Sequence, residues 1–300
     1  MNTHALNKTI FPCLPFNSKR VIFHHKGENE NFILRADNGQ SFILKKYRQD
    51  RKQRLEIELE IELCKFLRKS GIIVPEYKTF KDGESVLFLD DHKYTIQEIV
   101  SGYMIYRPDD NHYYEIGKSY RKLHNLNLPP DLSSQLPSID KDTISSAFHY
   151  IEENKTIDID VVKKLSQFKN KAISNLDFSP KNLVHFDLHD GNMIYTPQGL
   201  CMIDWEECGL GSGVFDLAVS MTRLIKMNDS SSLIKALLHG YGKVDFEQLK
   251  YATIYKYIYL ACFVAKFEDI LKNESLGQLL TRYLGYFEKI ENEISEEGLR

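Results

Sequence analysis

Two aspartates and an asparagine have the residue types that phosphate chemistry requires. Asp187 and Asn192 lie in the stretch Leu-Val-His-Phe-Asp-Leu-His-Asp-Gly-Asn, and Asp204 follows seventeen residues after Asp187. Their carboxylate and carboxamide oxygens are hard ligands, and Mg²⁺ favours one or two carboxylates together with substrate phosphates. Asp, Gly and Asn also form turns, so these residues by themselves are equally consistent with a solvated turn.

A short β-hairpin is expected between the two aspartates. Apolar runs at 193–195 and 200–203 flank Thr-Pro-Gln-Gly, a pattern that predicts two strands joined by a tight turn. Because a strand advances about 3.3 Å per residue, the chain should go out and return to nearly the same place. We therefore expect Asp187, Asn192 and Asp204 to meet at one end of the hairpin.

The order of these residues resembles a known enzyme family. His-x-Asp-x-x-x-x-Asn, a hairpin and then Ile-Asp is similar to the catalytic loop and metal-binding aspartate of protein kinases. With Phe186 after His185 and Trp205 after Asp204, the stretch resembles the aminoglycoside phosphotransferase and choline-kinase group of small-molecule kinases. The resemblance is firm over residues 183–218 and looser elsewhere.

The resemblance implies an α+β, protein kinase-like fold with two lobes. Residues 1–100 would form the nucleotide-binding lobe, an antiparallel sheet with one helix, with a hinge near 97–102. Residues 103–300 would form a larger, mainly helical lobe for catalysis and acceptor binding. The implied activity is transfer of the γ-phosphate of ATP to a hydroxyl of a small molecule, such as an antibiotic or a choline-, homoserine- or sugar-like metabolite.

The resemblance also assigns roles within the motif. Asp187 would be the catalytic base that faces the acceptor hydroxyl, and His185 would brace the loop. Asn192 and Asp204 would hold Mg²⁺ against the phosphates of ATP, with GTP left as an alternative nucleotide. Positioning and charge neutralisation supply most of the rate in such a transfer.

Short strands are expected near the start of the chain, at 21–23, 32–35 and 41–47. The loop around Gly27 lacks a Gly-x-Gly-x-x-Gly pattern, so its covering of the phosphates is implied by the resemblance alone, with a plain hairpin turn as the alternative. Lys45 and Lys46 end the third strand and point to opposite faces. The resemblance favours Lys45 as the lysine that contacts the α- and β-phosphates.

Residues 54–67 carry two competing patterns. Glu and apolar residues alternate strictly, which is a strand signal. Leucines also recur every four residues, and Glu is depleted in strands, so a helix ending at Ser70-Gly71 is expected. The resemblance implies that this helix supplies a carboxylate to the strand lysine; Glu60 fits the family register, with Glu56 and Glu58 as alternatives.

Further strands at 85–89 and 94–100 precede Gly102. In the resembling family the backbone here reads adenine, and counting back from the glycine indicates Glu98 C=O and Val100 N–H. An ordinary edge strand is the alternative.

The second half reads as mainly helical. Helices are predicted at 113–127, 141–153, 159–176, 233–238, 246–267 and 276–294. The glycine-rich stretch 209–213 reads as a flexible loop, and Asp216 as a carboxylate that anchors a loop or a helix N-terminus rather than a catalyst. Glu206, Glu207 and the carboxylates of the C-terminal helices could offer an anionic wall to an aminated acceptor.

Composition limits the partners. A net charge of −3 and a pI of about 6.4 argue against nucleic acid. Five cysteines without a Cys-x-x-Cys pair argue against a disulfide framework. The longest apolar run, at 257–265, is too short to cross a bilayer, and no secretory signal begins the chain. A cytoplasmic monomer or dimer without a membrane partner is expected.

Two other functions compete with the small-molecule kinase. A protein kinase is disfavoured by the missing glycine-rich loop, by Phe186 and by the absent Ala-Pro-Glu. A catalytically silent nucleotide-binding regulatory module is disfavoured by the intact set of Lys45, Asp187, Asn192 and Asp204.

Overall fold

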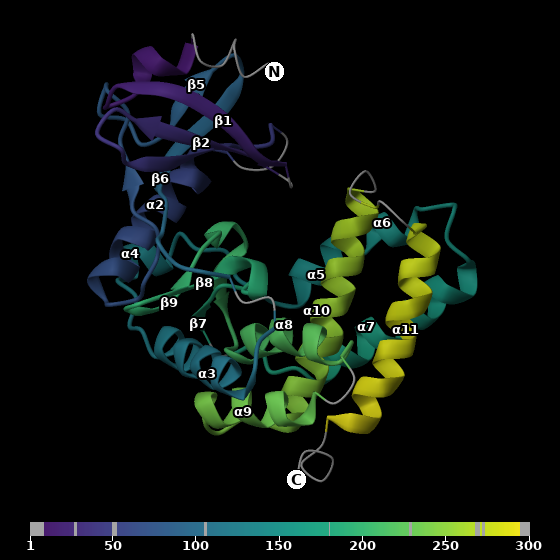
Figure 1. Ribbon diagram of the computed structural model, residues 1–300. Coiled ribbons are helices and arrows are strands. Elements are labelled where there is room, and N and C mark those ends of the chain that lie inside the picture. Colours follow the sequence, from purple (N-terminus) through teal and green to yellow (C-terminus); the bar gives the residue numbers. More distant parts are fainter. Residues whose placement is uncertain are drawn as a thin grey trace. The chain divides into compact units, whose positions relative to one another are not determined.

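The structure is a computed structural model that describes residues 9–26, 29–49, 53–104, 107–179, 181–227, 230–267, 271 and 274–294. The chain divides into two compact units (Figure 1). Unit 1 comprises Met1–Met104 and Met193–Glu206, and unit 2 comprises Ile105–Asn192 and Glu207–Arg300.

Unit 1 is built on an antiparallel sheet. Its strands follow the order β1 (Ser18–Lys26), β2 (Glu30–Ala36), β3 (Ser41–Lys46), β6 (His92–Glu98) and β4 (Tyr77–Lys78), and β5 (Leu87–Leu89) also pairs with β6. Alternate residues of β2 and β3, among them Phe32, Leu34, Phe42 and Leu44, bury one hydrophobic core. The three predicted N-terminal strands are confirmed, and β1 and β2 are longer than expected.

The helical prediction for the Glu-Leu segment is confirmed by α2 (Arg54–Lys69). A capping box formed by Gln53 and Glu56 begins the helix, and Gly71, with φ of +77°, follows its C-cap. The buried face includes Ile57 and Ile61, whereas Leu55 is 77% exposed. Helical periodicity has therefore prevailed over the alternation of Glu and apolar residues.

The predicted hairpin is confirmed by β8 (Met193–Thr196) and β9 (Gly199–Met202). The sequence placed it in the second lobe, but the structure groups it with unit 1. Tyr103 N–H donates to Tyr195 C=O at 3.0 Å, and Met202 N–H donates to Ile73 C=O at 2.9 Å. These strand-like bonds join segments that are far apart in the sequence, so no local pattern could reveal them.

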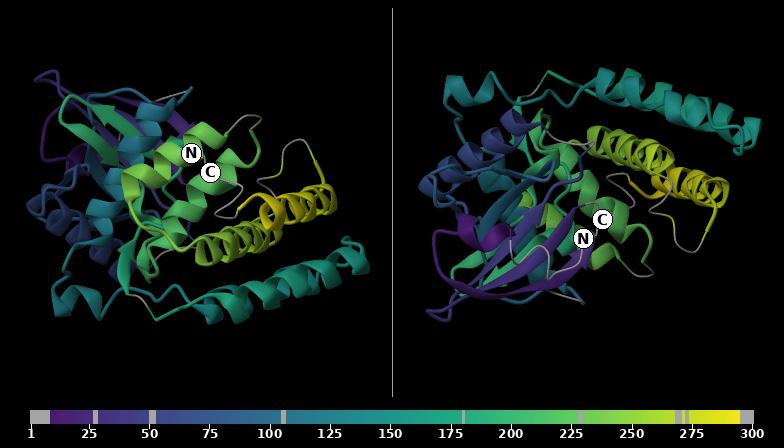
Figure 2. Two further views of the ribbon diagram at one scale, coloured as in Figure 1. Left: turned by 90° about the horizontal axis from the view of Figure 1, so that it is seen from below. Right: turned by 90° about the horizontal axis from the view of Figure 1, so that it is seen from above.

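Unit 2 is mainly helical. Its helices are α3 (Asp110–His124), α4 (Pro130–Ser133), α5 (Lys141–Ala147), α6 (His149–Glu152), α7 (Ile159–Asn175), α8 (Val214–Leu224), α9 (Ser231–Tyr241), α10 (Phe246–Lys266) and α11 (Leu276–Glu293). The long helix α10 packs against α5, α6, α7, α8 and α11, and it lies beside α11 in both views of Figure 2. It is apolar around most of its circumference, as a helix with this many neighbours must be.

Glycines serve close packing in the stretch after the hairpin. The segment Gly209–Gly211 forms β10, which pairs with β7 (Asn182–Val184), so the expectation of a flexible loop at 209–213 is wrong. A Cβ at Gly209 would lie 2.6 Å from Pro137 C=O. The glycines allow the backbone to approach the segment before α5.

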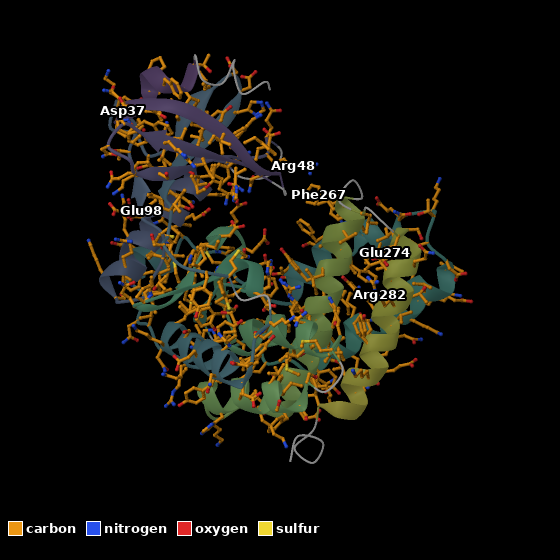
Figure 3. The ribbon with its side chains drawn as sticks, in the orientation of Figure 1. Asp37, Arg48, Glu98, Phe267, Glu274 and Arg282 are labelled. Carbon is orange, nitrogen blue, oxygen red and sulfur yellow. The ribbon has the colours of Figure 1, made fainter. Side chains whose placement is uncertain are left out.

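The last helix is tied at its start by polar contacts. Ser275 caps α11 by accepting from Gln278 N–H, and Arg282 pairs with Glu274 at 2.8 Å (Figure 3). None of the helices in the described ranges has both the length and the apolar character that a membrane crossing needs.

The contact between α3 and α9 depends on two glycines. A Cβ on Gly240 would lie 2.1 Å from Tyr114 C=O, and one on Gly117 would lie 2.1 Å from Leu237 C=O. We predict that Gly240→Ala lowers the free energy of unfolding by about 1–3 kcal/mol, because the helices must separate. Urea denaturation measures this change.

The control is Gly285→Ala on α11, where a Cβ would meet nothing within 4 Å. This variant should be about 0.4–1 kcal/mol more stable than the wild type, because alanine restricts the unfolded chain. Equal effects of the two substitutions would contradict the packing argument.

Candidate active site

The loop that carries Asp187 begins where β7 ends, in unit 2. Phe186, directly before Asp187, has φ of +65°, a conformation that bulky residues rarely adopt. Its N–H donates to Asp216 Oδ1 at 2.7 Å, and the N–H of His185 donates to Asp216 Oδ2 at 3.0 Å. One carboxylate therefore binds two successive amides and fixes the path of the loop.

Asp216 lies in the first turn of α8 and is fully buried. His124 Nε2 lies 3.0 Å from Asp216 Oδ2, and since a carboxylate only accepts, His124 is the donor. Burial by itself would raise the pKa of Asp216, but the hydrogen bond and charge of His124 and the charge of His185 hold it below its ordinary value of 3.8. The prediction that Asp216 anchors a loop is confirmed.

Asp187 and Asn192 contact each other within the loop. Asn192, at the end of the 3-10 turn Asp190–Asn192, donates from Nδ2 to Asp187 C=O at 2.9 Å and to Asp187 Oδ2 at 3.3 Å. These bonds direct the amide nitrogen to Asp187, so Oδ1 is the Asn192 atom suited to a metal. His185 is fully buried and accepts from Asp187 N–H at 3.4 Å, which suits a bracing role.

A second polar group lies in unit 1, around Lys45. This lysine is 5% exposed, and its Nζ lies 2.7 Å from Asp204 Oδ1 and also pairs with Glu206. Asp204 has φ of +65°, which turns the chain directly after the hairpin. Asn29 Nδ2 donates to Glu206 Oε1 at 2.5 Å, and Asn29 Oδ1 accepts from Arg48 N–H.

The charges around Lys45 are unbalanced. Burial would lower the pKa of Lys45, but Asp204 and Glu206, with Tyr47 and Glu60, raise it well above its ordinary value. Burial also raises the pKa of Glu206, and the charges of Asp204 and Glu60 act in the same direction. Three carboxylates thus share one ammonium, an arrangement that a further cation would stabilise.

Glu206 has an oxygen that fits a metal ion. Its Oε2 is buried and has no hydrogen-bond partner among the described residues. Together with Asp204, this gives two carboxylates, the number that Mg²⁺ takes when phosphates complete its coordination. No group of three His, Cys, Asp or Glu side chains in the described part of the chain could hold a metal by itself.

The three candidate partners of Lys45 on α2 differ in their surroundings. Glu60 is 2% exposed, accepts from Tyr77 O–H at 2.7 Å and contributes to the raised pKa of Lys45. Glu56 caps the helix, and Glu58 pairs with Arg54. Glu60 is therefore the carboxylate of α2 whose charge acts on Lys45, although the closest carboxylates are Asp204 and Glu206.

The other residues predicted to contact the nucleotide are Gly27, Glu98 and Val100. Gly27 is outside the described residues. Glu98 is the last residue of β6, with an exposed side chain (Figure 3), and Val100 follows two residues later. Glu98 N–H donates to Glu76 C=O at 2.8 Å, so the strand edge is ordered at this point. Adenine binding by Glu98 and Val100 stays a prediction.

The sequence-based expectation of an anionic wall is wrong for Glu206, which is buried against Lys45. Glu207 accepts a hydrogen bond from Tyr259 O–H. Sequence reasoning also missed Asn29, and His189, whose Nε2 lies 3.8 Å from Asp187 Oδ2. The position of Glu206 two residues after Asp204 could have indicated its place beside Lys45, whereas no sequence pattern indicated the role of Asn29.

The structure thus joins Asp187 with Asn192 in unit 2, and Lys45 with Asp204 in unit 1. A protein-family model described as "Phosphotransferase enzyme family" matches residues 20–252. An uncharacterised protein of Synechocystis sp. is 23% identical over 259 residues, which are 80% of this chain and 70% of that protein.

Solved structures share the fold. A microcompartment-associated aminopropanol kinase matches with a TM-score of 0.78 at 18% identity over 99% of both chains. The amicoumacin kinase hAmiN, in complex with AMP-PNP, Ca²⁺ and Ami, matches with a TM-score of 0.75 at 17% identity over 98% of this chain and 95% of that one. The predicted α+β, kinase-like fold is confirmed.

The anchoring carboxylate generates a prediction about stability. Asp216→Asn should lower the free energy of unfolding at neutral pH by about 3–5 kcal/mol, because an amide cannot accept from all three donors. Since the folded pKa of Asp216 lies below 3.8, its stabilisation is complete above that pH and is lost as pH falls through the folded value. Urea denaturation at several pH values measures both effects.

The difference in the free energy of unfolding between the wild type and Asp216→Asn should therefore become smaller below about pH 3.8. Asp245→Asn, at the N-cap of α10, is the matched control, because Asn caps helices as well as Asp. A constant difference at all pH values, or an equal loss in the control, would contradict the anchoring role.

Proposed function

Because the chain belongs to the phosphotransferase enzyme family, we propose that it transfers the γ-phosphoryl group of ATP to a hydroxyl of a small molecule. The acceptor oxygen forms a bond to the γ-phosphorus, and the bond from that phosphorus to the β–γ bridging oxygen breaks. ADP leaves with the electron pair, and the hydroxyl proton passes to a carboxylate.

The observation that carries this proposal is the setting of Asp187. Its side chain is 31% exposed, while the backbone on its N-terminal side is fixed by Asp216. A carboxylate that is both held and accessible can orient a hydroxyl and accept its proton, which contributes about 10²–10⁴-fold to a rate. His185 and Asn192 hold the same loop.

The group in unit 1 is proposed to hold the nucleotide. Lys45 is a compact cation suited to the α- and β-phosphates, and Glu60 supports its charge. Asp204 and Asn192 are the proposed Mg²⁺ ligands, and the buried Oε2 of Glu206 adds an oxygen to the set. Bound Mg²⁺ would neutralise the charge that develops on the phosphates.

The acceptor is proposed to be a hydroxylated small molecule with an amino group. The similar structures include a kinase named for aminopropanol and an aminoglycoside-type phosphotransferase, APH(2")-IIa, in complex with gentamicin. Both amino alcohols and aminoglycosides therefore belong in an acceptor panel. We place the reaction in the cytoplasm, where ATP is available.

The first test is ADP release from Mg·ATP across a panel of amino alcohols, aminoglycosides, other antibiotics, choline, homoserine and sugars. We expect one acceptor class to stimulate release and Asp187→Asn to lower kcat by about 10²–10⁴-fold, because the base is lost. Asp131→Asn, the same change at an exposed position on α4, is the control.

If an acceptor still stimulates ADP release in Asp187→Asn, the assignment of Asp187 as the base is contradicted. Tight nucleotide binding without stimulation by any acceptor would favour the silent nucleotide-binding module instead.

The metal site has a readout that needs no acceptor. Mg²⁺ should tighten ADP binding to the wild type, measured by calorimetry. Asp204→Asn and Glu206→Gln should each reduce that gain by about 10-fold or more, because an oxygen ligand is lost. Glu58→Gln, which changes a partly exposed carboxylate of α2, should keep the full gain. An undiminished Mg²⁺ effect in Asp204→Asn would contradict the assignment.

A further inference from the structure

A lysine is buried in the middle of α10. Lys256 is 1% exposed, although lysine is almost never fully buried without partners. Burial lowers its pKa, while the charges of Asp187, Glu207 and Asp216 act in the opposite direction. A buried ammonium is unfavourable in free energy unless it is paired and hydrogen-bonded. Nothing in the sequence motif accounts for a lysine at this position.

The contacts of Lys256 converge on the loop of Asp187. Its Nζ donates to Phe186 C=O at 2.5 Å and lies 3.7 Å from Asp187 Oδ1. It also lies 4.1 Å from the ring centroid of Phe186 and 4.8 Å from that of Tyr259. The two aromatic faces favour the charged ammonium through cation–π attraction.

Phe186 is thereby held from both sides. Its N–H is bound by Asp216 on α8, and its C=O is bound by Lys256 on α10, a helix that packs beside α8 (Figure 1). The residue between these two bonds has the left-handed φ of +65°. A strained conformation persists only where the surroundings determine it, and here an anion and a cation do so.

The two carboxylate oxygens of Asp187 have different neighbours. Oδ1 faces Lys256, whereas Oδ2 lies 3.3 Å from Asn192 Nδ2 and 3.8 Å from His189 Nε2. Because each of the two oxygens has its own partner, rotation of the carboxylate is restricted. Its orientation is therefore set by a helix some seventy residues further along the chain.

We propose that Lys256 is a positioning residue that holds Phe186 and the carboxylate of Asp187 in the geometry needed for proton acceptance. This inference rests on the proposed function, which makes Asp187 the base. The side chain of Lys256 is only 2% exposed, so it acts through Asp187 and does not touch the acceptor.

The test compares Lys256→Met, which keeps the length but removes the charge, with Lys256→Arg, which keeps charge and donor. Lys256→Met should lower kcat by about 10- to 100-fold with unchanged ADP affinity, because a small displacement of a reacting group is enough for such a loss. Lys256→Arg should recover part of it. Lys250→Met, on the same helix, is the control, since Lys250 pairs with Glu247.

A double variant separates positioning from a purely structural role. In the Asp187→Asn background, Lys256→Met should cause no further loss of kcat, because its effect passes through the missing base. An additional loss equal to that in the wild type would overturn the proposal. So would a wild-type kcat in Lys256→Met, or a parallel loss of ADP affinity.

Amide hydrogen exchange gives a readout that does not need an acceptor. Lys256→Met should exchange faster over residues 183–192, while residues 54–69 of α2 stay unchanged. Unchanged exchange over the loop would overturn the proposal. If the wild type shows no phosphotransfer at all, the proposed function fails, and the exchange comparison still decides whether Lys256 holds the loop.

Discussion

The carboxylate of Asp216 carries a charge in the interior of unit 2 and accepts hydrogen bonds from two successive amides, those of His185 and Phe186. An uncompensated buried charge is strongly unfavourable, so the three donors around it are obligatory. Because two of these donors belong to the backbone, they fix the loop itself. The position of Asp187 therefore follows from a constraint imposed by α8, and Lys256 of α10 adds a matching constraint from the other side of Phe186.

Unit 1 shows the opposite electrostatic situation. Around Lys45, the carboxylates of Asp204, Glu206 and Glu60 outnumber the cation, and one buried oxygen of Glu206 has no hydrogen-bond partner among the described residues. In unit 2 the donors match the carboxylate of Asp216, whereas in unit 1 the carboxylates exceed the cation. Under the proposed function, this excess would hold the metal that accompanies the phosphates, and each group would supply part of what phosphoryl transfer needs.

Local patterns explain which features could be predicted. The hairpin, α2 and the loop residues Asp187 and Asn192 were predictable, because turn residues, periodicity and motif spacing are short-range signals. Lys256 and Asn29 were not, because their roles arise from contacts with residues far away in the sequence. The prediction of a flexible loop at 209–213 was wrong for a related reason. The glycines permit close packing against the segment before α5, and a sequence cannot distinguish this role from flexibility.

Direct transfer from the nucleotide to a small molecule is the central claim, and a single-turnover experiment with γ-labelled Mg·ATP tests it most directly. With enzyme in excess and the stimulating acceptor present, all transferred label should appear on the acceptor, and none on the protein. Label on a protein side chain, or only in inorganic phosphate, would contradict direct transfer to a hydroxyl. Label that stays in bound nucleotide would show that the chain binds ATP without using it.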